Sequence, residues 1–390
     1  MFQIAGAGCC LLDLIYAGVD FSAGAFGRFR SLGPGDGGLE PGALVFTDDF
    51  ERFSGLSWRQ ALGQLTTGLF PHGNIGGPAA VALIGAAQLL DASRFSVRFV
   101  GAVGADKWGR ELRRRLGRTP LTTRLVERPG GTPFTYVLSD PRFDEGRGER
   151  TFINNIGAAW HLGPEDLDES FFRSDLAVFG GTALVPLLHD TLDTLLPRVK
   201  AAGGLTVVNT VYDFRSQRRD PGGRWPLGRT DKTYTAIDLL LADREEALRL
   251  SGQATVRQAI DWFLARGVGA TLVTDGIRNI EAGVGSRRFV PLEARTFPVS
   301  QSVLRDLHAH PEHQGDTTGC GDNFAGGVIT SLALQMEAGN RQLDLRDAAA
   351  WGAVCGGLAC YHLGGVWTDT FPGEKWARVL SCLEADRRLV

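Results

Sequence analysis

Residues 176–208 read LAVFGGTALVPLLHDTLDTLLPRVKAAGGLTVV, a strand pattern, a helix pattern and a second strand pattern in succession. The first four residues are apolar and β-rich, and from Leu187 to Val199 apolar side chains recur at helical spacing. Gly203 and Gly204 end that helix, and Leu205–Val208 begin the second strand. Two apolar strands that are joined through a helix with short turns predict a right-handed βαβ unit in a mostly parallel sheet.

The same alternation continues toward the C-terminus. A strand candidate at Ile237–Leu241 is followed by a helix that Thr255 caps and Gly267 ends, and Ala270–Val273 forms the next strand candidate. We therefore expect an α/β protein with a mainly parallel central sheet flanked by helices, in which residues 1–390 form a single domain.

Composition and charge argue against several classes of protein. Hydrophobic residues make up 43% of the chain and charged residues 22%, which is typical of a folded protein with a sizeable core. The net charge is −3, and the densest basic stretch, at 110–118, is typical of a solvated helix face, so we expect no nucleic-acid or membrane partner. The first residues lack a signal-peptide pattern, and the six cysteines contain no Cys-x-x-Cys pair. We expect a cytoplasmic protein with reduced thiols.

One uncharged segment is long enough to cross a membrane. Ala348–Trp367 contains no Asp, Glu, Lys or Arg and includes Gly352-x-x-x-Gly356. It consists mainly of Ala, Gly and Cys rather than Leu, Ile and Val, so its insertion into a bilayer would be poorly favourable. The composition therefore predicts a buried helix that packs closely against a sheet.

Two stretches depart from the alternation of strands and helices. Residues 20–72 are rich in Gly and Phe, with a helix candidate near Ser57–Leu65, and the sequence assigns them no further role. Residues 130–155 resemble a β-ribbon, with strand candidates at Phe134–Leu138 and Arg150–Ile153. We expect parts of 14–75 and 130–155 to form a small β-rich lid over the ligand edge of the sheet.

The segment GDTTGCGDNFAGG, residues 315–327, carries the strongest chemical signal. Apolar residues follow it at helical spacing, so Gly319–Gly321 should form the turn at the start of a helix. Glycines allow backbone N–H groups to converge on an anion there, and the helix dipole adds to the attraction. Asp322 would stand beside that anion as a base, which is what phosphoryl transfer to an alcohol needs. Taken alone, the pattern also fits an acid at an ordinary helix start.

Three motifs together resemble a known family. Asp316–Asp322 is similar to the Asp-Thr-x-Gly-Ala-Gly-Asp signature of the ribokinase/PfkB carbohydrate kinases, with Cys320 in place of Ala. Gly76-Gly77 opens an Ala-rich helix as the family's di-glycine motif does, and Phe99–Gly109 resembles its Gly-x-Val-Gly-x-Asp-x-x-Gly segment. The motifs occur in family order, and the resemblance runs from Ile4 to about Gly365.

The resemblance implies a role for each matching residue. Asp322 is expected to be the catalytic base, with an anion hole at Gly319, Cys320 and Gly321. The acceptor would be bound by Asp13, Gly76, Gly77 and Asn209, and the nucleotide by Thr274, Asp275, Gly276 and Thr318. Asp243–Glu246 resembles the family's Asn-x-x-Glu motif, so Glu246 and Asp243 are expected to hold Mg²⁺ through water. Three positions at which the family often has Asn or Asp depart from its pattern: Val81, Asn209 and Ala353.

The resemblance also implies the function and its cofactors. We expect an ATP-dependent kinase that moves the γ-phosphate to a primary hydroxyl of a sugar or sugar derivative, with Mg²⁺ as cofactor. A monovalent cation near Asp316 and a homodimer through the lid are further expectations from the family. A nucleoside kinase of the same fold and a non-catalytic sugar-binding relative remain alternatives at this point.

Other motifs carry less weight. His308, His310 and His313 in an apparent insertion at 300–314 have the spacing of metal ligands but lack a Cys or Asp at a defined offset, so a solvated loop is preferred. Gly6-Ala7-Gly8 lacks the third glycine of a dinucleotide-binding motif. The sequence contains no Gly-x-x-x-x-Gly-Lys-Ser/Thr, which excludes a standard P-loop kinase.

Overall fold

The predicted alternation of strands and helices forms a nine-stranded sheet in the computed structural model, which describes residues 1–33, 35–146, 148–292, 295–371 and 373–388. Seven neighbouring strands, from β6 to β12 in the order of the sheet, are parallel, and the last two at one edge are antiparallel. In spatial order the strands are β14 (Arg295–Phe297), β13 (Ile280–Val284), β12 (Ala270–Thr274), β11 (Leu239–Asp243), β10 (Leu205–Asn209), β9 (Leu176–Gly180), β1 (Phe2–Gly8), β5 (Phe95–Val103) and β6 (Thr122–Glu127).

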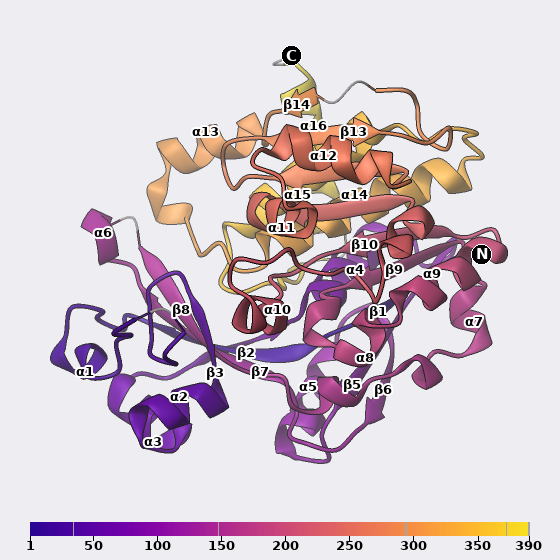
Figure 1. Ribbon diagram of the computed structural model, residues 1–390. Helices are drawn as coiled ribbons and strands as arrows, with labels where there is room; N and C mark the ends of the chain where they lie inside the picture. Colours follow the sequence, from indigo (N-terminus) through magenta and orange to yellow (C-terminus); the bar gives the residue numbers. More distant parts are fainter. Residues whose placement is uncertain (34, 147, 293–294, 372, 389–390) are drawn as a thin grey trace.

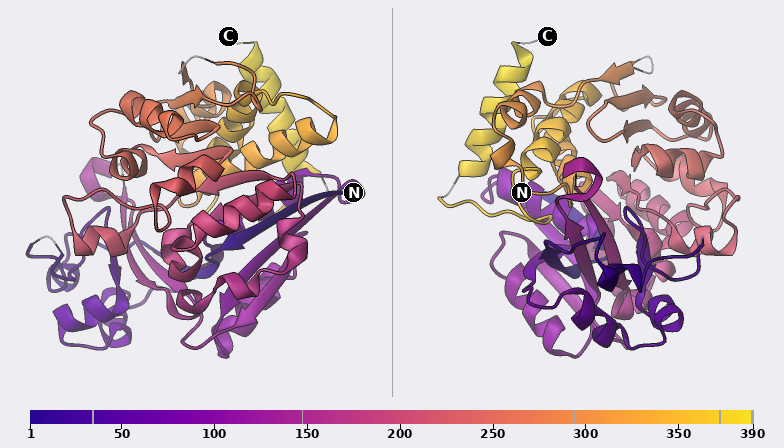
Figure 2. Two further views of the ribbon diagram at one scale, coloured as in Figure 1. Left: turned by 45° about the vertical axis from the view of Figure 1, so that its right-hand side comes forward. Right: turned by 90° about the vertical axis from the view of Figure 1, so that its left-hand side faces the viewer.

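Helices cover both faces of this sheet because its central strands are apolar on both sides. Val207 packs into the core on one face and its neighbour Val208 into the core on the other. The first face is covered by α4 (Pro78–Leu89), α14 (Cys320–Glu337) and α15 (Leu345–Ala359), and the second by α9 (Leu192–Ala201), α11 (Arg244–Ser251) and α12 (Val256–Ala265). Figure 2 shows the orange and yellow C-terminal helices on one side and the red helices on the other.

The βαβ unit at 176–208 is confirmed, with one change in its helix. Strands β9 and β10 are parallel neighbours, with Val178 opposite Val207. The predicted helix is divided into α8 (Pro186–His189) and α9, and at the break between them the Thr191 hydroxyl donates to the Leu187 carbonyl. Leu187, expected on the apolar side, is 43% exposed.

A second, five-stranded sheet lies beside the first (Figure 1). The chain enters it directly after β1, through Cys9 and Cys10. Three helices from the Gly- and Phe-rich region pack on one face, where Trp58 contacts the rings of Phe134 and Tyr136. The strands are β3 (Leu44–Phe46), β8 (Glu149–Asn155), β7 (Phe134–Asp140), β2 (Leu11–Ala17) and β4 (His72–Gly76), and the helices are α1 (Gly24–Gly27), α2 (Thr47–Ser54) and α3 (Trp58–Leu65).

The second sheet uses the two stretches that were predicted to form a lid. The β-ribbon is confirmed as the antiparallel pair of β7 and β8, and the helix predicted near Ser57–Leu65 is α3, which Ser57 caps. Strands β2 and β4 extend slightly beyond the range 14–75. Whether this sheet acts as a lid stays a prediction.

The remaining helices complete the outer layers. The buried helix expected within 348–367 is α15, which ends at Ala359, and among the described residues no helix is long and apolar enough to cross a membrane. The other helical elements are α5 (Lys107–Leu116), α6 (Phe143–Gly146), α7 (Glu169–Phe172), α10 (Phe214–Arg219), α13 (Gln301–Ala309) and α16 (Glu374–Arg387), with 3₁₀ turns at Gly157–His161, Pro164–Asp166, Thr182–Leu184, Asp231–Ala236 and Pro311–His313.

Candidate active site

The turn at the start of α14 offers free backbone N–H groups to an anion. Gly319 precedes the helix with φ of 76°, and a Cβ there would lie 2.4 Å from the Cα of Gly365, so glycine is required. Among the described residues, the amides of Gly321 and Asp322 have no hydrogen-bond partner. The space beside Gly321 is open, because a Cβ built there would meet no atom within 4 Å. The turn therefore has the donors and the room that a phosphate needs.

Neighbouring side chains hold this turn in place. The carboxylate of Asp316 accepts a hydrogen bond of 2.7 Å from the amide of Thr318. The side-chain amide of Asn323 donates to the carbonyl oxygens of Gly319, at 2.9 Å, and Gly365, at 2.8 Å. The amide groups of the turn are thus fixed before any ligand binds, which favours stabilisation of a developing charge.

Asp322 lies in the first turn of α14, where its side chain is partly buried. Burial raises the pKa of Asp322 to about 7. The charge of Asp322 in turn contributes to the raised pKa of both Asp13 and Glu246, each about 8, after burial as the largest cause. Of the acidic residues predicted for the site, Asp13 and Glu246 therefore both lie within electrostatic range of Asp322. A carboxyl group with a pKa near neutrality suits a general base.

The predicted acceptor residues Asp13, Gly76 and Gly77 are in direct proximity. Asp13 lies in β2, opposite Asn74 of β4. A Cβ at Gly76 would be 2.3 Å from Oδ2 of Asp13, and a Cβ at Gly77, whose φ is 100°, would be 2.3 Å from the carbonyl oxygen of Cys9. The two glycines thus let the β4–α4 connection pass closely against the Asp13 strand.

A row of buried polar side chains crosses the second sheet in register. Asn74, Asp13, Thr135 and Asn154 are paired from strand to strand, and each is at most 7% exposed. The side-chain amide of Asn154 donates to the Thr135 hydroxyl at 2.8 Å, while its Oδ1 is buried without a partner among the described residues. Asn74, Thr135 and Asn154 were not among the residues predicted from the sequence. Only Thr135 had a local signal, as a polar residue between the aromatic Phe134 and Tyr136.

Three further predicted residues end neighbouring parallel strands at the same edge of the main sheet: Asn209 of β10, Asp243 of β11 and Thr274 of β12. Asp243 caps α11, and Glu246 Oε2 accepts from the amide of Asp243 at 3.0 Å and from the Thr210 hydroxyl at 2.6 Å. The Oε1 atom of Glu246 has no partner in the described parts of the chain. Burial and the negative charge of Asp243 raise the pKa of Glu246. A cation would relieve that cost, so Asp243 and Glu246 fit an Mg²⁺ site.

The turn after β12 contains the predicted nucleotide residues. Gly276 has φ of 56° and is exposed, and the Asp275 carboxylate forms ion pairs with Arg278 at 3.0 Å and Arg244 at 3.9 Å. The turn lies at the same edge of the sheet as Asp243, because Thr274 is the register partner of that residue. A nucleotide-binding role for Thr274, Asp275 and Gly276 stays a prediction.

Arg150 is a further candidate for the site, and no sequence motif pointed to it. It projects from β8 in the second sheet, and its Nη1 donates a 2.7 Å hydrogen bond to the hydroxyl of Thr318. Its positive charge acts on the thiols of Cys320 and Cys360, where it opposes the effect of the nearby Asp316 carboxylate. Nothing in the sequence distinguishes this arginine from the others, because the contact joins residues far apart in the chain.

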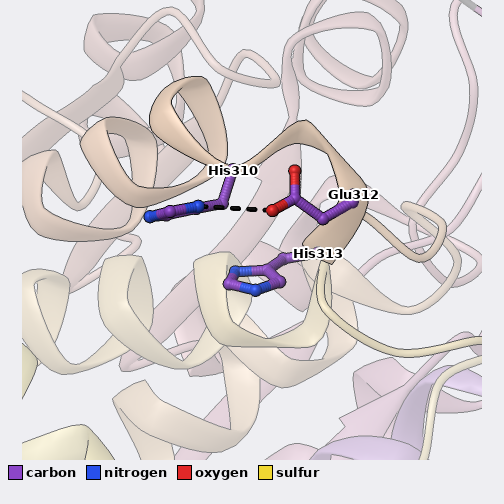
Figure 3. A group of neighbouring side chains, drawn as sticks. All are labelled: His310, Glu312 and His313. Atoms are coloured by element: carbon purple, nitrogen blue, oxygen red, sulfur yellow. Dashed lines mark hydrogen bonds and ion pairs between the residues drawn. The ribbon is translucent and has the colours of Figure 1, made fainter.

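The histidines of the 300–314 insertion lie outside this site. Figure 3 shows His310, Glu312 and His313 grouped at the end of α13, with candidate ligand atoms within 4.8 Å of one another. Glu312 and Asp306, which accepts from His313 at 3.4 Å, supply the acidic partners that the sequence alone did not reveal. All three grouped side chains are exposed, as expected, but the loop prediction is wrong for most of this segment, because Gln301–Ala309, which include His308, form α13 and Pro311–His313 form a 3₁₀ turn.

Sequence and structure comparisons agree on the fold and the family. The model of the "pfkB family carbohydrate kinase" matches residues 71–367. A fructokinase of Klebsiella pneumoniae is 27% identical over 308 residues, which are 76% of this chain and 91% of that protein. A fructokinase of Vibrio alginolyticus is 25% identical over 297 residues, which are 74% of this chain and 86% of that protein.

Solved structures give the same result at the level of the fold. Adenosine kinase from Schistosoma mansoni in complex with 2-fluoroadenosine has a TM-score of 0.70 at 16% identity and covers 94% of this chain and 97% of its own. Ribokinase from Thermotoga maritima has a TM-score of 0.62 at 17% identity and covers 98% of this chain and 100% of its own. The ribokinase-like fold is therefore confirmed, and the chain belongs to the pfkB family of carbohydrate kinases, which are ATP-dependent phosphotransferases.

Proposed function

We propose that this kinase transfers the γ-phosphate of ATP to a primary hydroxyl of a sugar or sugar derivative, with Asp322 as the base. The observation that carries the proposal is the placement of Asp322 beside the unpartnered amides of Gly321 and of Asp322 itself, in open space at a helix start. The amides bind the oxygens of the transferred phosphoryl group, and the carboxylate takes the proton from the attacking hydroxyl.

The polar row of the second sheet supports a polyhydroxylated acceptor. Asp13 accepts hydrogen bonds from acceptor hydroxyls, and the unpartnered Oδ1 of Asn154 accepts another, since a buried carbonyl oxygen without a donor is costly. In this arrangement Gly76 and Gly77 let the acceptor approach the backbone, Asn209 faces it from the main sheet, and the second sheet closes over it as a lid.

A nucleoside is the second candidate acceptor. A cavity of about 380 Å³ adjoins Asn154, and Phe46, Trp160 and Phe214 contribute aromatic rings to its wall. Such rings stack on a planar base as well as on the apolar face of a sugar. The cavity leaves room for an acceptor larger than a single hexose ring.

The chain also has suitable residues for the cofactors of the reaction. Asp243 and Glu246 would hold Mg²⁺ through water, and the ion when bound offsets the negative charge of the ATP phosphates. Thr274–Gly276 and Thr318 contact the nucleotide in this proposal. Oδ2 of Asp316 is buried without a hydrogen-bond partner in the described residues, which supports a monovalent cation beside it.

We extend the proposal to the assembly and its location. The side chains of Leu32 and Phe70, on the side of the second sheet, are 92% and 91% exposed, which supports a homodimer through that side. Dependence on ATP favours the cytoplasm.

An acceptor screen tests the proposal. The protein is incubated with Mg-ATP and single acceptors from two sets, ketoses and aldoses on one side and nucleosides on the other, and release of ADP is measured. We expect one sugar to give turnover well above the rate of ATP hydrolysis without acceptor. Turnover with nucleosides alone would replace the sugar by the second candidate. Thermal stabilisation by a sugar without any ADP release would contradict the proposed reaction.

A further inference from the structure

Two thiols meet at the phosphate-binding turn. Cys320 is the first residue of α14 and Cys360 follows the last residue of α15, and their Sγ atoms are 3.2 Å apart. The two helices are antiparallel and packed closely here, since a Cβ built on Gly356 would lie 3.0 Å from the carbonyl oxygen of Cys320. The pair therefore joins the turn to the end of a second helix, across forty positions of the chain.

This pair differs from the other cysteines of the chain. Both side chains are partly accessible, whereas Cys9, Cys10 and Cys355 are buried. The hydrogen bond from Cys320 lowers the pKa of the Cys360 thiol, while the same bond and burial raise the pKa of Cys320. Cys360 is therefore the sulfur that reacts first as a thiolate, with Cys320 in place as its partner.

We propose that Cys320 and Cys360 form a reversible disulfide that inactivates the phosphate-binding turn when the protein meets a peroxide. The inference rests on the proposed function in one respect only, the assignment of the turn to phosphate binding.

The chemistry balances with hydrogen peroxide as the two-electron oxidant. The Cys360 thiolate attacks one peroxide oxygen, the O–O bond breaks, and the departing hydroxide takes up a proton to leave as water, which gives a sulfenic acid. The sulfur of Cys320 then attacks the sulfenic sulfur, the S–S bond forms, and the sulfenic oxygen leaves with the thiol proton as a second water. A dithiol reverses the change by exchange, in which its own two sulfurs become the oxidised pair.

The bond would displace the turn because it requires the sulfurs to approach. A disulfide has an S–S distance of about 2.05 Å, so the sulfurs must move together by more than 1 Å. On the other side, Gly319 is already in contact with Gly365, so the turn is held between two fixed elements. A displacement of about 1 Å at a positioned group lowers turnover by about a hundredfold. We expect oxidation to lower kcat by at least tenfold.

The experiment follows thiols and turnover in the same sample. The reduced full-length protein is treated with hydrogen peroxide, free thiols are counted under denaturing conditions, and unreduced peptides are examined by mass spectrometry. We expect the six thiols to fall to four, a linked peptide pair containing Cys320 and Cys360, and a loss of kcat that dithiothreitol restores.

Two variants make the outcome specific. Cys360→Ser should fold normally, as its thermal unfolding will show, and should keep its turnover after peroxide without forming the linked pair. Cys382→Ser, which removes the other partly exposed thiol, should respond like the wild type.

Peroxide inactivation of Cys360→Ser, or formation of the disulfide without loss of turnover, would overturn the switch. Absence of the linked pair would overturn it as well. If no acceptor supports turnover, the thiol count still reports on the disulfide, so that result would count against the proposed function alone.

Discussion

Arg150 Nη1 lies 2.7 Å from the hydroxyl of Thr318, and this hydrogen bond connects the second sheet to the glycine turn at the start of α14. Thr318 is itself held by Asp316, whose Oδ1 accepts a hydrogen bond of 2.7 Å from the Thr318 amide. A guanidinium group at this place brings positive charge and several N–H donors to the edge of the turn. The contact therefore links the position of the second sheet to the charge around the turn that we propose to bind phosphate.

Substitution of Arg150 should impair turnover more than folding. We expect Arg150→Ala to lower kcat by about 10²-fold, because a preorganised donor to the developing charge is lost. Arg150→Lys should recover part of that loss, since it keeps the charge but not the planar group. Arg142→Ala is the matched control, because that exposed arginine lies just after β7 of the second sheet and pairs with Asp20 instead of Thr318. Equal kcat values for Arg150→Ala and Arg142→Ala in steady-state assays would remove Arg150 from the site.

Asp322→Asn should abolish most of the turnover while the protein remains folded. The amide cannot accept the hydroxyl proton, so we expect kcat to fall by at least about a hundredfold. Because the pKa of Asp322 is about 7 and the base must be ionised, the wild-type kcat/KM should rise with pH through that value, and the variant should lose this dependence. The measurement is the pH–rate profile of both proteins, with circular dichroism as the control for folding. A variant as fast as the wild type would show that another group is the base.

Substitution by alanine should affect ATP binding at one glycine of this turn and thermal stability at another. A Cβ at Gly321 meets no atom within 4 Å, so Gly321→Ala should leave the melting temperature unchanged but raise the KM for ATP by projecting a methyl group into the phosphate space. Gly319→Ala should unfold at a lower temperature, because its φ is 76° and the methyl group would meet Gly365. Thermal unfolding and ATP titration of both variants check this contrast. An unchanged KM in Gly321→Ala would place the phosphate elsewhere.

The sequence was sufficient for those features that are local in the chain. The turn at Gly319–Gly321 and the strands on either side of α8 and α9 follow from residue spacing within short segments. The polar row from Asn74 to Asn154 could not be found in that way, because it depends on the register of four strands. The same holds for Arg150 and for the pair of Cys320 and Cys360, which meet only through the packing of distant elements.

Glu246→Gln should raise the concentration of Mg²⁺ needed for half-maximal turnover. The substitution keeps the shape of the side chain and the hydrogen bond from Thr210 but removes the negative charge that favours a cation. Because Glu246 is buried and its pKa is about 8, the neutral amide should not destabilise the folded protein. Turnover is measured across an Mg²⁺ titration at fixed ATP, with Glu245→Gln on the same helix as control. Superimposable titrations of Glu246→Gln and wild type would exclude Glu246 from the metal site.

The ligand-free protein should lose stability as the pH rises from about 5 to 8. Asp13 and Glu246 are 7% and 8% exposed, and each has a folded-state pKa of about 8, above the value near 4 of an unfolded chain. Between these values the folded chain holds more protons than the unfolded chain, so the free energy of unfolding falls as pH increases through this window. Asp13→Asn removes one of the ionisations that burial shifts upward, so its melting temperature should depend less on pH and should exceed that of the wild type at pH 9. Asp91→Asn, which changes an exposed carboxylate, should keep the wild-type slope. Differential scanning calorimetry at several pH values gives these slopes, and a wild-type melting temperature that rises from pH 5 to 8 would contradict the burial of ionisable acids at this site.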